Sequence, residues 1–146
     1  MNILITGAVT AQAYQLQRHL DTNNSLIFAD SVDVPQSPNR RFIKIPASNS
    51  QSLAHLLLTT CLDQQIIKVY PLRKNEIRVL AEARQLFDEY GIKVMVPDKA
   101  LIESLFNKGL KGEIVVQDTI VCDHMPDRGV FILDPESKDF QLFTCD

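Results

Sequence analysis

The sequence contains no tryptophan, only five glycines and only three cysteines in 146 residues. Cys61, Cys122 and Cys145 are odd in number and widely spaced, which argues against a disulfide framework and for reduced thiols in a cytoplasm. No apolar run approaches the ~20 residues of a membrane-spanning helix, and the start MNILITG lacks the basic region of a signal peptide. We therefore expect a soluble cytoplasmic protein without a membrane partner.

Neither positive nor negative charge is in large excess, since 15 lysines and arginines face 18 aspartates and glutamates. The formal net charge is −3, so there is no electrostatic reason to expect nucleic acid as a partner. Hydrophobic residues make up 45% and charged residues 23%, which is ordinary for a globular protein. A chain of this length suits a single domain.

From residue 3 to residue 107, short β-rich runs alternate with segments of helical periodicity. The predicted strands cover residues 3–6, 26–29, 42–45, 66–70 and 92–96, and the predicted helices cover residues 10–20, 53–61, 74–90 and 99–107. Thr10 and Asp98 suit helix N-caps, and Gly91 suits a left-handed C-cap. This alternation predicts an α/β fold with an open, doubly wound, mainly parallel sheet of the Rossmann-like kind over residues 1–110.

Residues 111–146 follow a different pattern. The β-rich runs EIVVQDTIVCD, GVFILD and DFQLFTCD are separated by the turn-forming stretches HMPDRG and PESK. Consecutive strands with short turns predict an antiparallel β meander, which we expect to extend the same domain. The meander either adds to the edge of the sheet or pairs with another chain, so a homodimer or a partner interface is expected here.

The stretch ILITGAVTAQAYQLQRHL begins as a dinucleotide-binding turn does. Gly7 fills the first glycine position of that motif, but Val9 and Gln12 occupy the other two. The branched side chain of Val9 would crowd a pyrophosphate. The missing glycines therefore make an NAD(P)-dependent enzyme a distant alternative.

Some elements of a nucleotide site are nevertheless present. Asp30 ends a predicted strand about 20 residues after the turn, where a ribose-binding carboxylate usually lies. Free amides at the start of the helix near Thr10 suit a phosphate or a carboxylate. Gly7, Ala8, Thr10 and Asp30 are thus the candidate cofactor-binding residues, although Asp30 is equally a turn former at a strand end.

A family resemblance is carried by four segments taken together: ILITGAVTAQAYQLQRHL, LIFAD, RFIKIP and KVYPLRKNEIRVLAEARQLFDEYGIKVMVPD. Residues 2–109 resemble the N-terminal pre-ATP-grasp domain of carbamoyl-phosphate-synthase-like ligases of the ATP-grasp superfamily, most specifically over residues 69–96. In that family the ATP-binding lobes and the magnesium carboxylates lie downstream, and residues 113–146 resemble neither. The resemblance implies ATP or another adenine nucleotide as a candidate ligand and a separate ATP-grasp chain as a candidate partner.

The loop after residue 72 departs from the family. Members of the family often carry acidic residues there, facing the active-site cleft, whereas this chain has Arg73 and Lys74 and keeps only Glu76. One interpretation is that Arg73 and Lys74 meet an anion at the carboxyl edge of the sheet, where open α/β sheets bind ligands. The alternative is a solvated loop that begins a helix. Arg40 and Arg41 either join this basic edge or are ordinary loop charges.

Other clusters give weaker signals. Cys122, Asp123, His124 and Asp127 place possible metal ligands within six residues, but a polar turn beside a buried cysteine explains them more simply. No catalytic residue and no metal site is predicted. We expect a non-catalytic, stand-alone module that binds a small anion or a nucleotide, or docks onto another chain. The alternative is one subunit of a split ATP-grasp ligase.

Overall fold

The computed structural model describes residues 1–20, 25–36, 38, 40–47, 49, 51–106, 108–118 and 125–146. Five strands form one sheet: β1 (Asn2–Ile5), β2 (Ser25–Asp30), β3 (Arg41–Lys44), β4 (Ile66–Tyr70) and β5 (Lys93–Val94). The helices are α1 (Ala11–His19), α2 (Leu53–Asp63), α3 (Lys74–Glu82) and α4 (Arg84–Glu89), followed by the 3-10 turns η1 (Lys99–Leu101) and η2 (Glu103–Leu105). A second sheet contains β6 (Glu113–Gln117), β7 (Gly129–Leu133) and β8 (Phe140–Leu142).

The first sheet is parallel throughout, with the order β3-β2-β1-β4-β5. Strand order reverses between β1 and β4, because the chain runs outward from β1 to β3 and then returns to the other side of β1. This reversal is the topological switch point at which open α/β sheets bind ligands. The predicted α/β fold, with an open, doubly wound parallel sheet and a C-terminal antiparallel meander, is confirmed.

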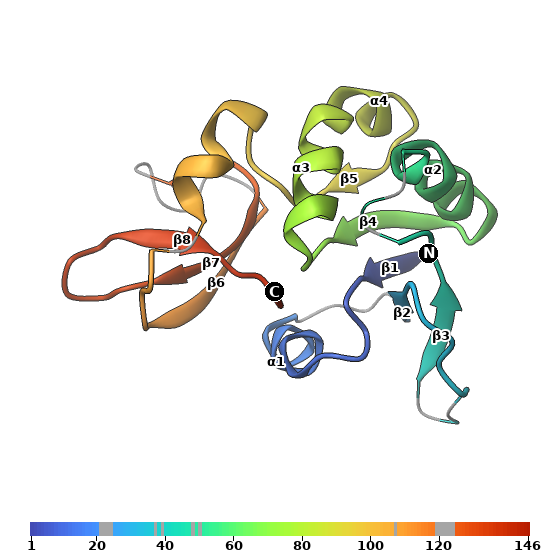
Figure 1. The fold of residues 1–146 in the computed structure, drawn as a ribbon, viewed down its shortest axis with the longest axis horizontal. Coiled ribbons are helices and arrows are strands. Elements are labelled where there is room, and N and C mark those ends of the chain that lie inside the picture. Colours follow the sequence, from blue (N-terminus) through green and yellow to red (C-terminus); the bar gives the residue numbers. More distant parts are fainter. Residues whose placement is uncertain are drawn as a thin grey trace.

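The two faces of the parallel sheet have different covers (Figure 1). One face packs against α2, α3 and α4, where Leu57, Ile77 and Phe87 join the strand residues Leu4 and Val69 in one buried cluster. The opposite face packs against α1 and the three-stranded sheet, which share a second buried cluster. The meander thus covers part of a sheet face that a helix covers in a fully doubly wound fold.

The meander is tied to the parallel sheet by charge as well as by packing. Asp118, directly after β6, is hydrogen-bonded by the ammonium groups of Lys68 on β4 and Lys93 on β5. Partial burial alone would raise the pKa of Asp118, but the hydrogen bonds and charges of the two lysines outweigh burial and lower it. Val130 and Phe131 on β7 are both buried and belong to different core clusters, so β7 has core contacts on both faces.

Two predicted helices differ from the structure. The helix predicted over residues 74–90 is divided at Ala83 into α3 and α4, although the predicted left-handed C-cap at Gly91 is confirmed by its φ of +74°. The segment predicted as a helix over residues 99–107 forms two 3-10 turns instead. Its buried residues are Ile102, Leu105 and Phe106, a spacing that an α-helix would also give, so the sequence pattern does not separate the two kinds of helix here.

Part of the free edge of β3 is covered by a side chain. The amide of Gln36 donates to the Phe42 carbonyl at 2.7 Å and accepts from the Phe42 N–H at 3.3 Å, as a neighbouring strand would.

Among the residues that the structure describes, no helix has both the length and the apolar character needed to cross a membrane.

Candidate functional site

The turn after β1 has the tight geometry expected of it. Gly7 has a φ of +65°, and its carbonyl accepts hydrogen bonds from the Thr10 N–H at 2.9 Å and the Thr10 hydroxyl at 2.6 Å. The Ala8 N–H donates to the Ala29 carbonyl on β2 at 3.1 Å. Thr10 is the N-cap residue of α1, but its hydroxyl bonds back to the turn rather than forward to the helix. The amides of Ala8 and Thr10 therefore have partners within the chain.

Asp30 lies at the end of β2 with a fully buried side chain. Its carboxylate accepts hydrogen bonds from the Val9 N–H at 3.2 Å and the Ser31 N–H at 2.8 Å. The guanidinium of Arg73 contacts both carboxylate oxygens through Nη2, at 2.8 and 2.9 Å. A ribose could reach Asp30 only by displacing donors that this chain already supplies.

Asp30 and Arg73, which the sequence analysis assigns to different ligands, therefore form one ion pair with each other. Asp30 was expected to face a ribose and Arg73 an anion, and the structure places them against each other at the switch point. Burial by itself would lower the pKa of Arg73, but the hydrogen bond and the charge of Asp30 outweigh burial and the pKa is raised. The role of either residue toward a ligand stays a prediction.

Glu76 is a member of this site that the sequence analysis left out of its candidates. It lies in the first turn of α3, is only 1% exposed, and is hydrogen-bonded to the Thr6 hydroxyl. Burial raises its pKa, against the opposing effects of the Thr6 hydrogen bond and the Arg73 charge. Within the described part of the chain, Glu76 Oε1 and Arg73 Nε are buried without hydrogen-bond partners.

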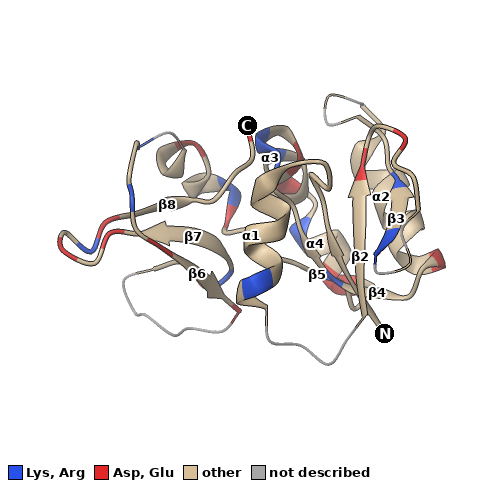
Figure 2. Cartoon of the chain, turned by 90° about the horizontal axis from the view of Figure 1, so that it is seen from below, with Lys and Arg blue, Asp and Glu red and all other residues tan. Residues whose placement is uncertain are grey.

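Residues 143–146, which follow β8, cover this site. Phe143 is buried, and the Cys145 N–H donates to the Leu72 carbonyl at 2.8 Å. Asp146 Oδ1 accepts a hydrogen bond from the Lys74 N–H, at the beginning of α3, at 2.9 Å. Figure 2 shows the end of the chain beside the beginning of α3. A carboxylate therefore already occupies a position at a helix N-terminus, where the dipole favours an anion.

Cys145 lies directly over the turn after β1. A Cβ atom added to Gly7 would be 3.1 Å from Cys145 Sγ, so the thiol occupies the space next to the glycine. Burial raises the pKa of the Cys145 thiol, in spite of the nearby charge of Arg73 and a hydrogen bond with Thr10. A thiol with a raised pKa is a poor nucleophile, so this position favours a packing role for Cys145.

The remaining candidates lie apart from the site or outside the described residues. Arg40 stacks on Tyr14 and Phe28, with its guanidinium carbon 3.5 and 4.1 Å from the ring centroids. Arg41 bonds Gln64, which precedes β4 at the amino edge of the sheet. The structure thus brings neither Arg40 nor Arg41 to the basic edge with Arg73.

The residues of the possible metal cluster are only partly described. Cys122, Asp123 and His124 lie outside the described residues, and Asp127 forms an ion pair with Arg84. Within the described ranges, no three histidine, cysteine, aspartate or glutamate side chains come together in a way that suits a metal ion.

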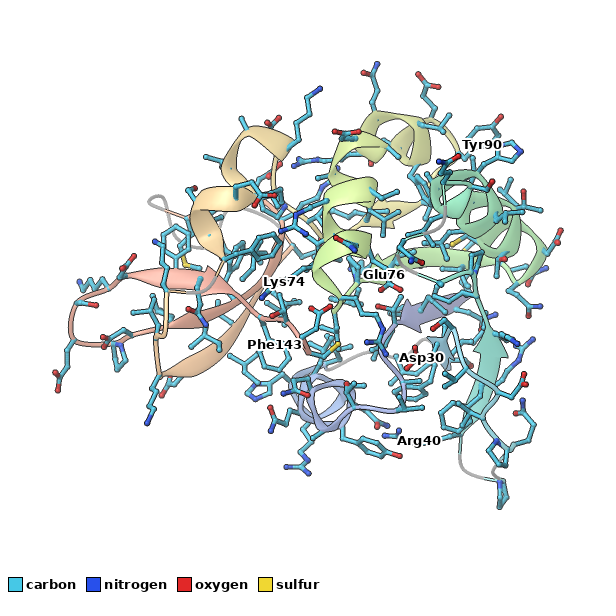
Figure 3. All side chains as sticks on the ribbon, in the orientation of Figure 1. Asp30, Arg40, Lys74, Glu76, Tyr90 and Phe143 are labelled. Carbon is cyan, nitrogen blue, oxygen red and sulfur yellow. The ribbon has the colours of Figure 1, made fainter. Side chains whose placement is uncertain are left out.

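The candidate site is therefore the carboxyl edge of the parallel sheet around the start of α3. In Figure 3, Lys74, Glu76, Phe143 and Asp30 lie in the region between the beginning of α3 and α1, and Tyr90 lies far from them. The chain matches no protein-family model and no curated protein. The resemblance to the pre-ATP-grasp domain stays a prediction.

Proposed function

We propose that this chain is a non-catalytic binding module of the pre-ATP-grasp type, and that its ligand is a small anion, a phosphate or a carboxylate, bound at the beginning of α3. One observation carries the proposal. The Lys74 N–H, at the carboxyl edge of the sheet and beside the switch point, already binds the carboxylate of Asp146.

Three features support an anion at this position. The N-cap residue of α3, Arg73, makes no side-chain hydrogen bond to the helix, so its own side chain does not cap the first amides. A helix N-terminus attracts negative charge through these amides and the helix dipole. The charge of the Arg73 guanidinium is balanced by Asp30, but it contacts Asp30 through Nη2 alone and its Nε is unpartnered among the described residues, so it offers a further N–H donor.

A free small anion fits this edge better than a dinucleotide. At the turn after β1, Asp30 is satisfied by Val9, Ser31 and Arg73, and Cys145 lies next to Gly7. The pyrophosphate and the ribose of a dinucleotide would need both of those places. At the beginning of α3, a bound anion would have to replace only the carboxylate of Asp146.

The test is calorimetric titration and thermal unfolding with inorganic phosphate, with acetate, Mg-ATP and NAD as separate arms. At a hundred times its Kd, a ligand raises the free energy of unfolding by about 2.7 kcal/mol, which raises Tm by several degrees. We expect this rise with phosphate or acetate. A rise with Mg-ATP alone would contradict the proposal and favour the split-ligase alternative.

Two variants at one position locate the anion. Lys74→Pro removes the backbone N–H at the first helical position, where proline is well tolerated, and Arg73 has the extended backbone that a following proline requires. Lys74→Ala removes the ammonium group and keeps the N–H. We expect Lys74→Pro to lose phosphate binding and Lys74→Ala to keep most of it. Unchanged phosphate binding by Lys74→Pro would exclude this site.

A further inference from the structure

We infer that a groove at the amino edge of the parallel sheet binds a small organic cation, an amine with an apolar body. The groove, here called the amino-edge groove, has a volume of about 450 Å³ and is lined by the end of α2, the beginning of β4 and the residues that follow α4. It lies at the opposite edge of the sheet from the proposed anion site, so this inference does not depend on the proposed function.

The lining of the amino-edge groove is mostly apolar and partly exposed. It includes the buried residues Ile66 and Ile92, whereas Leu62 on α2 and Tyr90 after α4 are 48% and 54% exposed. Figure 3 shows Tyr90 next to α2. Small-molecule sites are typically cavities of about 300–1,000 Å³ with an apolar lining and a few polar groups. The size and the lining of this groove therefore suit the apolar body of a small molecule.

Gln65, which also lines the groove, has a strained backbone. Its φ is +56°, in the left-handed region, directly after the C-cap of α2, where glycine is the usual residue. Its N–H donates to the Leu62 carbonyl at 3.4 Å and its carbonyl accepts from the Asn2 N–H at 3.0 Å, so this conformation is fixed from both sides. The side chain of Gln65 is exposed and forms no hydrogen bond with another described residue. A side chain that is kept despite strain and without a structural partner indicates a binding role.

Two acids give the groove its preference for a cation. Asp63 directly follows Leu62, and Glu89 directly precedes Tyr90, so each exposed wall of the groove has an exposed acid next to it in the chain. Neither carboxylate forms an ion pair with another described residue. The exposed ring of Tyr90 adds an aromatic face, which attracts an ammonium group through the cation–π interaction.

The lysines near the groove are engaged elsewhere. Lys68 and Lys93 each follow a groove residue in the chain, but both hydrogen-bond Asp118, which follows β6. An anionic ligand would meet the like charge of the two acids, and a second copy of this chain would bring the same acids with it. The charge therefore favours a separate, cationic ligand.

The experiment uses the full chain and tryptamine as the probe, because tryptamine joins an apolar indole ring to an ammonium group. Indole-3-propionate, which has the same ring and a carboxylate, is the matched control ligand. NMR titration measures both affinities. We expect saturable binding of tryptamine, about tenfold tighter than that of indole-3-propionate, since the two acids attract one ligand and repel the other. Equal affinities, or no saturable binding of tryptamine, would overturn the inference.

Substitutions in the walls locate the bound amine. Asp63→Asn should weaken tryptamine binding about two- to fivefold, as the loss of one exposed charge pair does. Leu62→Ala should also weaken it, whereas Leu56→Ala should not, because Leu56 is a similarly exposed leucine of α2 outside the groove lining. Equal effects of Leu62→Ala and Leu56→Ala would exclude this groove.

Gln65→Gly gives the sharpest test, because it should change stability and affinity in opposite directions. Glycine adopts a positive φ without strain, so the free energy of unfolding in urea should rise. The loss of the side chain should weaken tryptamine binding at the same time, and reduced folding could not explain that loss. Unchanged tryptamine affinity in Gln65→Gly would contradict the site.

Discussion

Two strand-to-helix junctions meet at the carboxyl edge of the parallel sheet, and they are completed in different ways. At the junction of β1 and α1, the turn amides bond to the Gly7 and Ala29 carbonyls and to Asp30, all within the first 30 residues. At the junction of β4 and α3, the Lys74 N–H bonds to a carboxylate 72 residues away. At the first junction the partners of the Ala8, Val9 and Thr10 amides all lie within the first 30 residues, whereas the second junction has a partner from a distant segment of the chain. The proposed anion would compete there with a single carboxylate, that of Asp146.

The acidic side chains of the two junctions show the same contrast. Asp30 is buried with donors from Val9, Ser31 and Arg73. Glu76 is equally buried, but one of its oxygens lacks a partner within the described residues, and burial raises its pKa. Burial of a carboxylate is unfavourable unless it is paired and hydrogen-bonded, so Asp30 is well satisfied and Glu76 is the strained carboxyl of the two.

The largest effect is expected from breaking the ion pair that joins the junctions. Arg73→Ala leaves the Asp30 carboxylate buried without its cation, so we expect a loss of about 3–5 kcal/mol in the free energy of unfolding, measured by urea denaturation. Arg78→Ala is the control, because its ion pair with Glu103 is exposed and should contribute far less. Similar losses in both variants would show that the Asp30–Arg73 pair does not hold the junctions together.

An intermediate effect is expected at Gly7. Gly7→Ala places a Cβ at a φ of +65° and 3.1 Å from Cys145 Sγ, whereas Gly91→Ala meets a similar φ of +74° with nothing within 4 Å. Both variants should lose about 1 kcal/mol from backbone strain, and Gly7→Ala about 1 kcal/mol more from the contact with the thiol. Chemical denaturation measures both losses.

The same comparison in a Cys145→Ala background separates strain from contact. Removing the thiol should abolish the excess loss of Gly7→Ala over Gly91→Ala and leave the strain common to both. If Gly7→Ala still loses more stability than Gly91→Ala without the thiol, the excess loss does not come from a contact with Cys145.

The fold was predictable because its signals are local. Apolar runs, N-caps and the glycine at residue 91 gave the elements and their order, and parallel strands necessarily bring Gly7, Asp30 and Arg73 to the same edge. The sequence could not show which side chains pair with each other at that edge. The Asp30–Arg73 pair spans 43 residues and the Lys74–Asp146 contact spans 72, and no local pattern carries that information. Glu76 was missed for a related reason, since an acid in the first turn of a helix usually faces solvent and complements the dipole.

The smallest effect is expected from Glu76→Gln, and it should appear as a change with pH. Burial raises the pKa of Glu76 above its ordinary value of 4.5, so the folded state holds a proton that the unfolded state releases. The stability of the wild type therefore falls as pH rises from about that ordinary value through the raised pKa, and Glu76 contributes no further change above it. Glutamine keeps the shape and cannot ionise, so the free energy of unfolding of Glu76→Gln should match that of the wild type near pH 4 and exceed it near pH 8.

Urea denaturation across this pH range measures the difference, with Glu82→Gln as the control, because Glu82 is an exposed acid on the same helix. A difference that does not change with pH would show that Glu76 is not the strained carboxyl, and the contrast with Asp30 would then fail.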